Sequence, residues 1–265
     1  MAGEPVTASV ENGVETWTMQ NVPVNALNPE LAAAFEERLD ATLANDEVSV
    51  VLLESGLKVF SAGADATWIA AVVKEKGASG LVDDFKATLD RFRGIWQRMR
   101  ESDVLFVACI GGHAIAGGLE LAAACDLRFA ADDDAIKIGA SEMKLFGVMP
   151  SGGGGTQYIS RLMGPARALA FLLEAEPCSP KRAVDLGLVE RLCPAEELHA
   201  SAQAFGSTLA KRAGRVGLNA AKRLTLDAAA LPLGQALEFD ASVHWDSMRR
   251  GGFVPGVDAF VARFG

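Results

Sequence analysis

The segment from Val104 to Cys125 constrains the fold most, because it is apolar and long enough to resemble a membrane span. Two glycine pairs, Gly111-Gly112 and Gly117-Gly118, interrupt it, and Glu120 lies in its second half. Glycine pairs favour turns, and a carboxylate is costly inside lipid. The segment therefore predicts a buried strand, a tight turn and a short buried helix in a protein core.

Short aliphatic runs alternate with helical periodicity through the first 150 residues. Asn12-Gly13 predicts a hairpin, and Asn28 followed by Pro29 predicts the start of a helix that continues to about Leu43. Beyond Gly152 the pattern predicts an almost wholly helical layer. We expect parallel β-α-β units and one main domain with a helical tail. The other expected strands are 48–53, 104–110, 127–130 and 135–138, and the other expected helices are 68–100, interrupted at Gly77 and Gly80, and 117–124.

Composition excludes several classes of protein. The chain has 34 acidic and 25 basic residues, a formal charge of -9, so no broad positive field is available for nucleic acid. The four cysteines lack C-x-x-C spacing, the three histidines share no metal-ligand spacing, and no serine lies in a G-x-S-x-G elbow. We therefore expect no disulfide, no metal and no serine hydrolase. The first residues lack the features of a secretory or transit signal, which favours a cytoplasmic location.

Two glutamates near glycine-rich turns are the candidate catalytic groups: Glu120, three residues beyond Gly117, and Glu142, from a separate segment. An oxyanion hole needs backbone N-H groups without partners, and the first N-H groups of a helix meet that need. Ala64, at a loop-to-helix junction, and Gly117 are the candidate donors. Two carboxylates in a water-poor pocket repel each other, so an acid and a base coexist near neutral pH. That arrangement suits addition of water to an activated double bond.

Structural explanations remain open for the same residues. Gly117-Gly118 would also allow close helix-strand packing, Glu120 would also pair with a buried arginine, and Glu142 would also fit an ordinary loop. The glycines from Gly152 to Gly155 resemble a phosphate-binding loop, but no Gly-Lys-Ser/Thr follows them, which favours the start of a helix.

Short motifs over nearly the whole length match one known family. They are Val24 to Leu27, Phe60 to Asp65, Gly112 to Glu120 with Cys125-Asp126, Ser141-Glu142 before Gly147 to Pro150, Gly153 to Gln157, Ala183 to Leu188 and Gly256 to Phe260. On these motifs the chain resembles the crotonase superfamily and, within it, the enoyl-CoA hydratases. The resemblance implies an α/β fold with a ββα-spiral, acyl-CoA-binding catalytic core at 1–195. It also implies a C-terminal helical oligomerisation region at 196–265 that forms a homotrimer or a dimer of trimers.

The resemblance assigns roles to individual residues. Ala64 and Gly117 take the oxyanion-hole positions, Glu120 the position that activates water, and Glu142 the position that exchanges a proton at the α-carbon. Coenzyme A is expected to contact Ser61, Ala62, Asp65 and Ala66, mainly through their backbone, and Phe260 of a neighbouring subunit is expected to line the acyl or CoA channel.

The implied activity is syn addition of water to a 2-enoyl-CoA, a lyase reaction of fatty acid metabolism. Coenzyme A enters as part of the substrate, and no other cofactor, membrane or nucleic-acid partner is expected. Three features depart from the family pattern: Ala66-Thr67 replaces an apolar-lysine pair, Ser141 replaces proline, and Phe146 is an insertion. Alternatives are an enoyl-CoA isomerase, a 3-hydroxyacyl-CoA dehydratase, a retro-aldol lyase or a non-catalytic acyl-CoA-binding protein.

Overall fold

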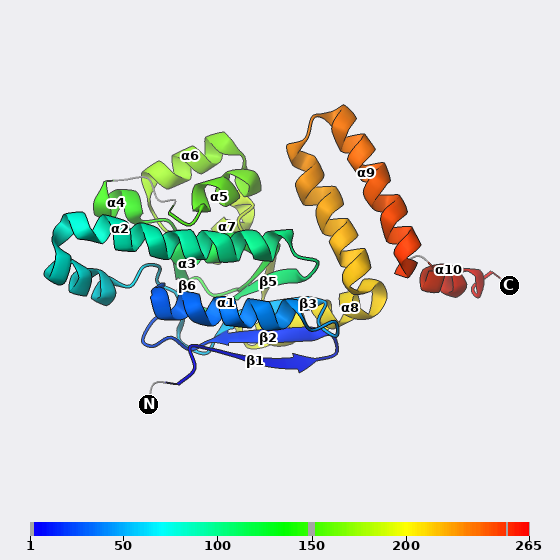
Figure 1. The fold of residues 1–265 in the computed structure, drawn as a ribbon, viewed down its shortest axis with the longest axis horizontal. Helices are drawn as coiled ribbons and strands as arrows, with labels where there is room; N and C mark the ends of the chain where they lie inside the picture. The colour runs from blue at the N-terminus through cyan, green and yellow to red at the C-terminus, as the bar shows by residue number, and fades with distance from the viewer. Residues whose placement is uncertain (1–2, 148–151, 253, 265) are drawn as a thin grey trace.

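The computed structural model describes residues 3–147, 152–252 and 254–264 (Figure 1). Two sheets form its α/β core. The larger sheet has the order β1-β2-β3-β5-β7-β9, in which only β1 and β2 pair antiparallel. The smaller sheet, β4-β6-β8, is parallel. The predicted parallel β-α-β units are therefore confirmed. The strands are β1 (Val6–Glu11), β2 (Val14–Met19), β3 (Val50–Ser55), β4 (Val59–Ser61), β5 (Leu105–Ile110), β6 (His113–Ile115), β7 (Leu127–Ala131), β8 (Ile138–Gly139) and β9 (Arg191–Cys193).

The predicted hairpin and the first helix are confirmed. Asn12 and Gly13, with φ of 53° and 79°, form the two-residue turn between β1 and β2, and both positions need the left-handed conformation that Asn and Gly tolerate. The side chain of Asn28 accepts a hydrogen bond from the Leu31 amide and so caps α1 (Pro29–Leu43). The apolar face of α1 is buried through Phe35 and its neighbours.

Helix α2 (Ala66–Glu101) is longer than predicted and bends once. Gly77 has φ 74° and separates two helical parts, as expected, but Gly80 stays inside the helix, so the second predicted interruption is wrong. A glycine in a helix costs about 1 kcal/mol relative to alanine, which the packing of the second part of α2 offsets. That part buries Phe92, Ile95 and Trp96.

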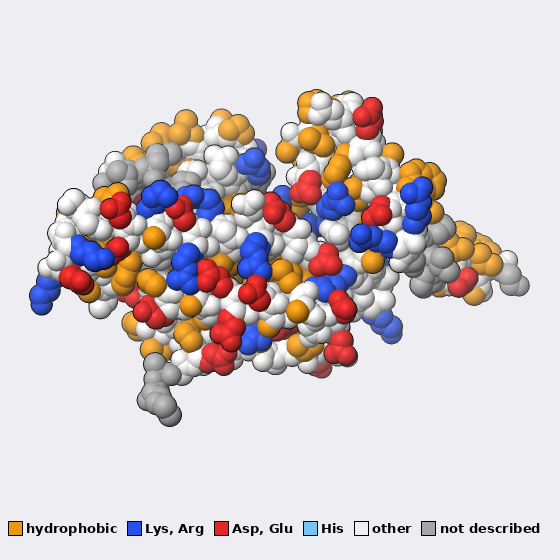
Figure 2. All heavy atoms as spheres, viewed as in Figure 1, with side chains coloured by type: hydrophobic (Ala, Val, Ile, Leu, Met, Phe, Trp, Pro, Cys, Tyr) orange, Lys and Arg blue, Asp and Glu red, His pale blue; other side chains and the backbone are white. Residues whose placement is uncertain are grey.

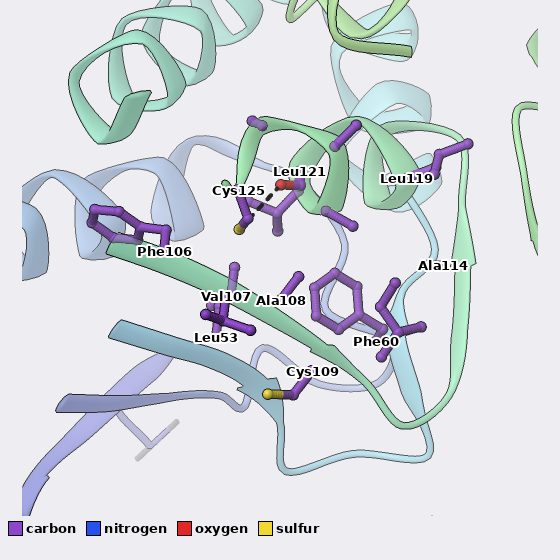
Figure 3. Close-up of a cluster of buried hydrophobic side chains, with 14 of the residues drawn as sticks. Leu53, Phe60, Phe106, Val107, Ala108, Cys109, Ala114, Leu119, Leu121 and Cys125 are labelled. Atoms are coloured by element: carbon purple, nitrogen blue, oxygen red, sulfur yellow. Dashed lines mark hydrogen bonds between the residues drawn. The ribbon is translucent and has the colours of Figure 1, made fainter. Parts of the chain in front are cut away.

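Helix α3 (Gly117–Ala124) lies over β5 in the centre of the core (Figure 3). Leu121 and Cys125 lie above Phe106 and Val107, and Phe60 of the smaller sheet lies beside them. A methyl group on Gly118 would overlap the carbonyl oxygen of Ser61, so this glycine allows α3 to pack directly on β4. Close helix-strand packing, one of the structural explanations for the glycine pair, is therefore present.

The predicted helical layer is largely correct beyond Gly152, except that β9 runs through it. β9, β4 and β6 each have only three residues, and β8 has two where four were expected, so their sequences carry too little alternation to mark a strand. The remaining helices are α4 (Glu142–Phe146), α5 (Gly155–Met163), α6 (Pro165–Glu174), α7 (Pro180–Leu186), α8 (Leu198–Lys222), α9 (Leu233–Ser247) and α10 (Val254–Val261), with short helical turns at 195–197, 223–230 and 248–252.

The C-terminal helices first join the core and then leave it. Leu198 and Ala202 of α8 are buried in the core, whereas α9 and α10 stand away from the sheets (Figure 1). On α9, Leu233 is 76% and Leu237 61% exposed. The division at residue 195 stays a prediction, but the first half of α8 contributes to the core. Among the described residues, no helix is both long and apolar enough to span a bilayer.

A buried ion pair ties the end of α8 to the main sheet. Nζ of Lys222 lies 3.0 Å from Oδ2 of Asp126, and the two side chains are 3% and 2% exposed. The ammonium group also donates hydrogen bonds to the carbonyl groups of Met99 and Val104, and the carboxylate accepts one from the Phe106 amide. Burial raises the pKa of Asp126 and lowers that of Lys222, although each charge opposes the shift of the other.

Candidate active site

The segment before α1 holds the loop that carries Ala64. The side chain of Asn25 donates a hydrogen bond to the carbonyl group of Phe60 (3.0 Å), and the hydroxyl group of Ser61 donates to the carbonyl group of Asn25 (2.7 Å). Leu27 forms a parallel bridge with Ala64: its amide donates to the Gly63 carbonyl at 2.7 Å, and its carbonyl accepts from the Asp65 amide at 3.1 Å. In a parallel bridge of this kind the N-H group of Ala64 points away from Leu27.

Gly117, the first residue of α3, supplies the second candidate donor. Its N-H group has no carbonyl partner within the helix, because the first N-H groups of a helix lack one. The preceding residue, Ala116, has φ 55°, an unusual value for a residue with a side chain, and its amide is held by the Gly139 carbonyl at 2.8 Å. This conformation sets the direction in which α3 begins. Within the described residues, neither the Ala64 nor the Gly117 amide has a protein acceptor.

The two candidate donors come from backbone segments in contact. A methyl group on Gly63 would lie 2.9 Å from the Gly117 nitrogen, and one on Gly117 would lie 3.4 Å from the Gly63 α-carbon. Gly117 and Ala64 are both partly exposed. The segments that carry the two candidate donors are therefore in contact, and their role as an oxyanion hole stays a prediction.

Glu120 is buried on α3, with 5% of its surface exposed. The backbone N-H groups of Gly153 and Gly155, at the start of α5, donate hydrogen bonds to its carboxylate. A methyl group on Gly155 would lie 2.5 Å from both Cδ and Oε1 of Glu120, so glycine is required for this close approach. Burial and the nearby charge of Glu142 raise the pKa of Glu120 to about 7, against the opposing effects of these hydrogen bonds and of Arg93. No ion pair with a buried arginine is formed by Glu120 among the described residues.

Glu142 lies at the start of α4 and interacts electrostatically with Glu120. It is half-buried, and its Oε2 atom is buried without a hydrogen-bond partner among the described residues. Burial raises the pKa of its carboxyl group as well. Both carboxyl groups are therefore easier to protonate than a carboxyl group in water, and their role as an acid/base pair stays a prediction.

The glycine run 152–155 makes a contact that the sequence analysis did not predict. The predicted start of a helix is confirmed, because α5 begins at Gly155 and Gly154, with φ 100°, caps it. The contact of Gly153 and Gly155 with Glu120 was not predicted, since it joins residues more than 30 positions apart. The absence of side chains in an otherwise unexplained glycine run was the available signal.

The residues expected to contact coenzyme A have different environments. Asp65 caps α2 by accepting hydrogen bonds from the amides of Thr67 (2.8 Å) and Trp68 (3.0 Å). Burial opposes its ionisation, but these bonds and one from Asn28 lower its pKa. Ala62 and Ala66 are exposed, on either side of the candidate oxyanion loop.

Ser61 and Phe260 are placed differently. Ser61 is fully buried, and its hydroxyl group accepts a hydrogen bond from the Gly63 amide in addition to its bond with Asn25, so its side chain serves the loop. Phe260 is 62% exposed on α10, at the opposite end of the molecule from α2 (Figure 1). One chain does not bring Phe260 to this site, and its role in a neighbouring subunit stays a prediction.

The surface over α1 and α2 carries charges of both signs. Figure 2 shows acidic and basic side chains interspersed on this face. Ion pairs between the two helices include those of Arg91 with Glu36 and of Arg98 with Asp40.

Comparisons with known proteins identify the family of this chain. The family model for enoyl-CoA hydratase/isomerase matches residues 9–264. A probable enoyl-CoA hydratase of Bacillus subtilis is 34% identical over 184 residues, which are 69% of this chain and 67% of that protein. The alpha subunit of the fatty acid oxidation complex of Shewanella frigidimarina is also 34% identical, over 69% of this chain but only 25% of that much longer protein.

Solved structures share the fold over nearly the whole length. The structure of an enoyl-CoA hydratase from Geobacillus kaustophilus has a TM-score of 0.87 and 27% sequence identity to this chain. The match covers 99% of this chain and 96% of the Geobacillus chain. An enoyl-CoA hydratase from Polaromonas has a TM-score of 0.86 and 25% identity, with 97% of both chains covered. The fold is therefore crotonase-like, with a C-terminal helical region, and the chain belongs to the enoyl-CoA hydratase/isomerase family.

Proposed function

We propose that the protein is a 2-enoyl-CoA hydratase. The observation that carries this proposal is the interaction of two carboxyl groups with raised pKa values, Glu120 and Glu142, which come from separate helices. The contact between Gly63 and Gly117 also supports the proposal. Beside this contact the N-H groups of Ala64 and Gly117 lack protein acceptors among the described residues. The 34% identity to a probable enoyl-CoA hydratase supports the same substrate class.

In the proposed reaction, Glu120 removes a proton from water as the water oxygen bonds to the β-carbon. The π electrons of the double bond move toward the thioester, and negative charge develops on its oxygen, where the N-H groups of Ala64 and Gly117 stabilise it. Donors of this kind, fixed in place before the reaction, account for much of the rate enhancement in such sites. The enolate then takes a proton from Glu142 at the α-carbon.

At the end of the turnover Glu120 is protonated and Glu142 is ionised, so one proton must return from the first to the second through solvent. Burial raises the pKa of both carboxyl groups, so each can hold the proton at the stage where the reaction requires it. We assign syn addition to this arrangement, and we place the reaction among the carbon-oxygen lyases of fatty acid metabolism.

The proposal includes the binding of coenzyme A and the assembly of the protein. We expect the thioester to reach the site past the exposed residues Ala62 and Ala66, with Asp65 fixing the start of α2 between them. We further propose that the apolar residues exposed on α9 and α10 are covered by other subunits in a trimer or a dimer of trimers.

The direct test is to mix the purified protein with crotonyl-CoA and with longer, branched and aromatic 2-enoyl-CoA esters. Loss of the enoyl-thioester absorbance together with a product heavier by one water molecule is the expected result. A product of unchanged mass would indicate isomerisation, and cleavage to two smaller products would indicate a retro-aldol reaction. Binding of the esters without turnover would favour the non-catalytic acyl-CoA-binding protein instead.

A further inference from the structure

The second part of α2 covers the glycine loop that binds Glu120. A methyl group on Gly152 would be 3.0 Å from Cδ2 of Leu89 and closer still to other atoms of that side chain. Arg93, one turn further along α2, donates a hydrogen bond to the carbonyl group of Gly152 at 2.6 Å. The next turn brings Trp96 over Gly153. Side chains of α2 therefore hold the start of the glycine loop 152–155 in place.

Trp96 and the carboxyl group of Glu120 both lie close to the α-carbon of Gly153. A methyl group on Gly153 would be 2.5 Å from Cη2 of the indole ring and 2.9 Å from Oε2 of Glu120. The six-membered ring and the carboxylate oxygen therefore border the same small space. Trp96 is fully buried, with the ring of Phe92 5.8 Å away on its own helix, so the apolar ring takes the place of water beside this oxygen.

Packing alone does not explain why residue 96 has an indole ring. Its Nε1 atom is buried and has no hydrogen-bond acceptor among the described residues. An unmade hydrogen bond of this kind costs about 1–3 kcal/mol, which phenylalanine would avoid. By contrast, Nε1 of Trp17, the other fully buried tryptophan, donates to the hydroxyl group of Thr42 at 3.2 Å. What the larger side chain adds at position 96 is the ring edge that borders Glu120.

We propose that Trp96 is a positioning residue that controls proton transfer at Glu120 by excluding water from one side of its carboxyl group. Removing water from a carboxyl group disfavours the charged form. The proposed hydratase needs a base that ionises close to neutral pH. The role of Trp96 in catalysis therefore rests on the proposed function. Trp96 itself touches no reacting atom in this scheme.

Other charged and titratable groups face Glu120 from each element packed on it. They are Glu142 from α4, Arg93 from α2 and Tyr158 from α5. Glu142 raises the pKa of Glu120, and Arg93 lowers it. All three residues are unchanged in a variant at position 96, so the substitution alters only the ring and none of these charged or titratable groups.

The test compares Trp96→Phe with Trp17→Phe, which makes the same chemical change at a distant buried site. Glu120 is titrated in each protein through the infrared band of its protonated carboxyl group, with Glu120→Gln identifying that band. The pH dependence of kcat/KM for crotonyl-CoA hydration is measured in parallel. For Trp96→Phe we expect the Glu120 titration and the acidic limb of kcat/KM to move down by about one pH unit. Trp17→Phe should leave both unchanged.

An unchanged Glu120 titration in a folded Trp96→Phe protein would overturn the proposal. If that variant does not fold, judged by circular dichroism, Trp96→Leu replaces it, with the same expectation. The infrared titration needs no turnover, so it tests Trp96 even if no enoyl-CoA is hydrated. A shifted titration without any hydration would refute the proposed function but not the role of Trp96 at Glu120.

Discussion

Gly63 lies directly against the amide nitrogen of Gly117, so that a methyl group on the first would be 2.9 Å from the second. Gly63 also has φ 85°, a conformation that glycine adopts without strain. We predict that Gly63→Ala lowers kcat for 2-enoyl-CoA hydration by about 10²–10³, the effect of losing one oxyanion donor. Steady-state kinetics with crotonyl-CoA measure this change.

Gly111→Ala is the matched control for Gly63→Ala. Gly111 does not have a positive φ, and an added methyl group would meet only Leu198, at an ordinary distance of 3.6 Å. It should retain near-normal kcat. Equal losses in the two variants would show that an added methyl group acts through general stability and not through the oxyanion donors.

Glu120→Gln and Glu142→Gln should each lower kcat by about 10²–10⁴, because an amide neither accepts the proton of water nor supplies one to the α-carbon. The affinity for a saturated acyl-CoA should change little, since neither side chain is assigned to coenzyme A. Calorimetric binding and single-turnover kinetics separate the two effects. Glu174→Gln, at an exposed position on α6, is the control. Near-normal turnover in either site variant removes that glutamate from the mechanism.

The raised pKa of Glu120 also has a consequence for stability. An unfolded chain ionises this group near pH 4.5, whereas the folded protein holds the proton until about pH 7. Folding is therefore penalised progressively as pH rises between these values, and the penalty is complete above them. Glu120→Gln removes it, so the variant should be more stable than the parent by about 1–3 kcal/mol at pH 8 and nearly equal to it at pH 4.5. Urea unfolding at the two pH values tests this sign.

Lys222→Met should destabilise the protein by about 3–5 kcal/mol, because it leaves Asp126 buried without its partner. Adding Asp126→Asn should recover much of that loss, since asparagine is neutral and still accepts the Phe106 amide hydrogen bond. Lys181→Met, which removes exposed ion pairs, should cost less than about 1 kcal/mol. Chemical denaturation of the three proteins provides the comparison, and a double variant no more stable than Lys222→Met would contradict the pairing argument.

The sequence predicted correctly those elements that are set by interactions between residues close to one another in the chain. Asn12-Gly13 and the Asn28 cap act within a few residues, and the hairpin and α1 form as expected. β9 pairs with β7 across more than 60 residues, and its three residues carry no alternation of their own. Gly80 is the opposite case, because packing of α2 overrides a local preference for a break.

The same distinction applies to the site. Glu120, Glu142, Ala64 and Gly117 were predicted from residue type and nearby turns, and their catalytic roles stay predictions. The structure adds the contact of Gly63 with Gly117 and the electrostatic interaction of the two glutamates. Trp96 and Gly153 lie far apart in the sequence, and only the folded chain brings them to one carboxyl group. Their roles required three-dimensional positions, since an apolar helix face and a glycine run each have ordinary structural explanations.

The pairing of Lys222 with Asp126 also affects how the protein is made. Lys222 is translated 118 residues after Val104, whose carbonyl group it binds. At typical rates of synthesis this separation corresponds to roughly ten seconds on the ribosome. Asp126 precedes Lys222 by 96 residues, so it has no partner ammonium group until the end of α8 has been made. We therefore expect the buried pair beside β5 and β7 to form only after α8 has left the exit tunnel.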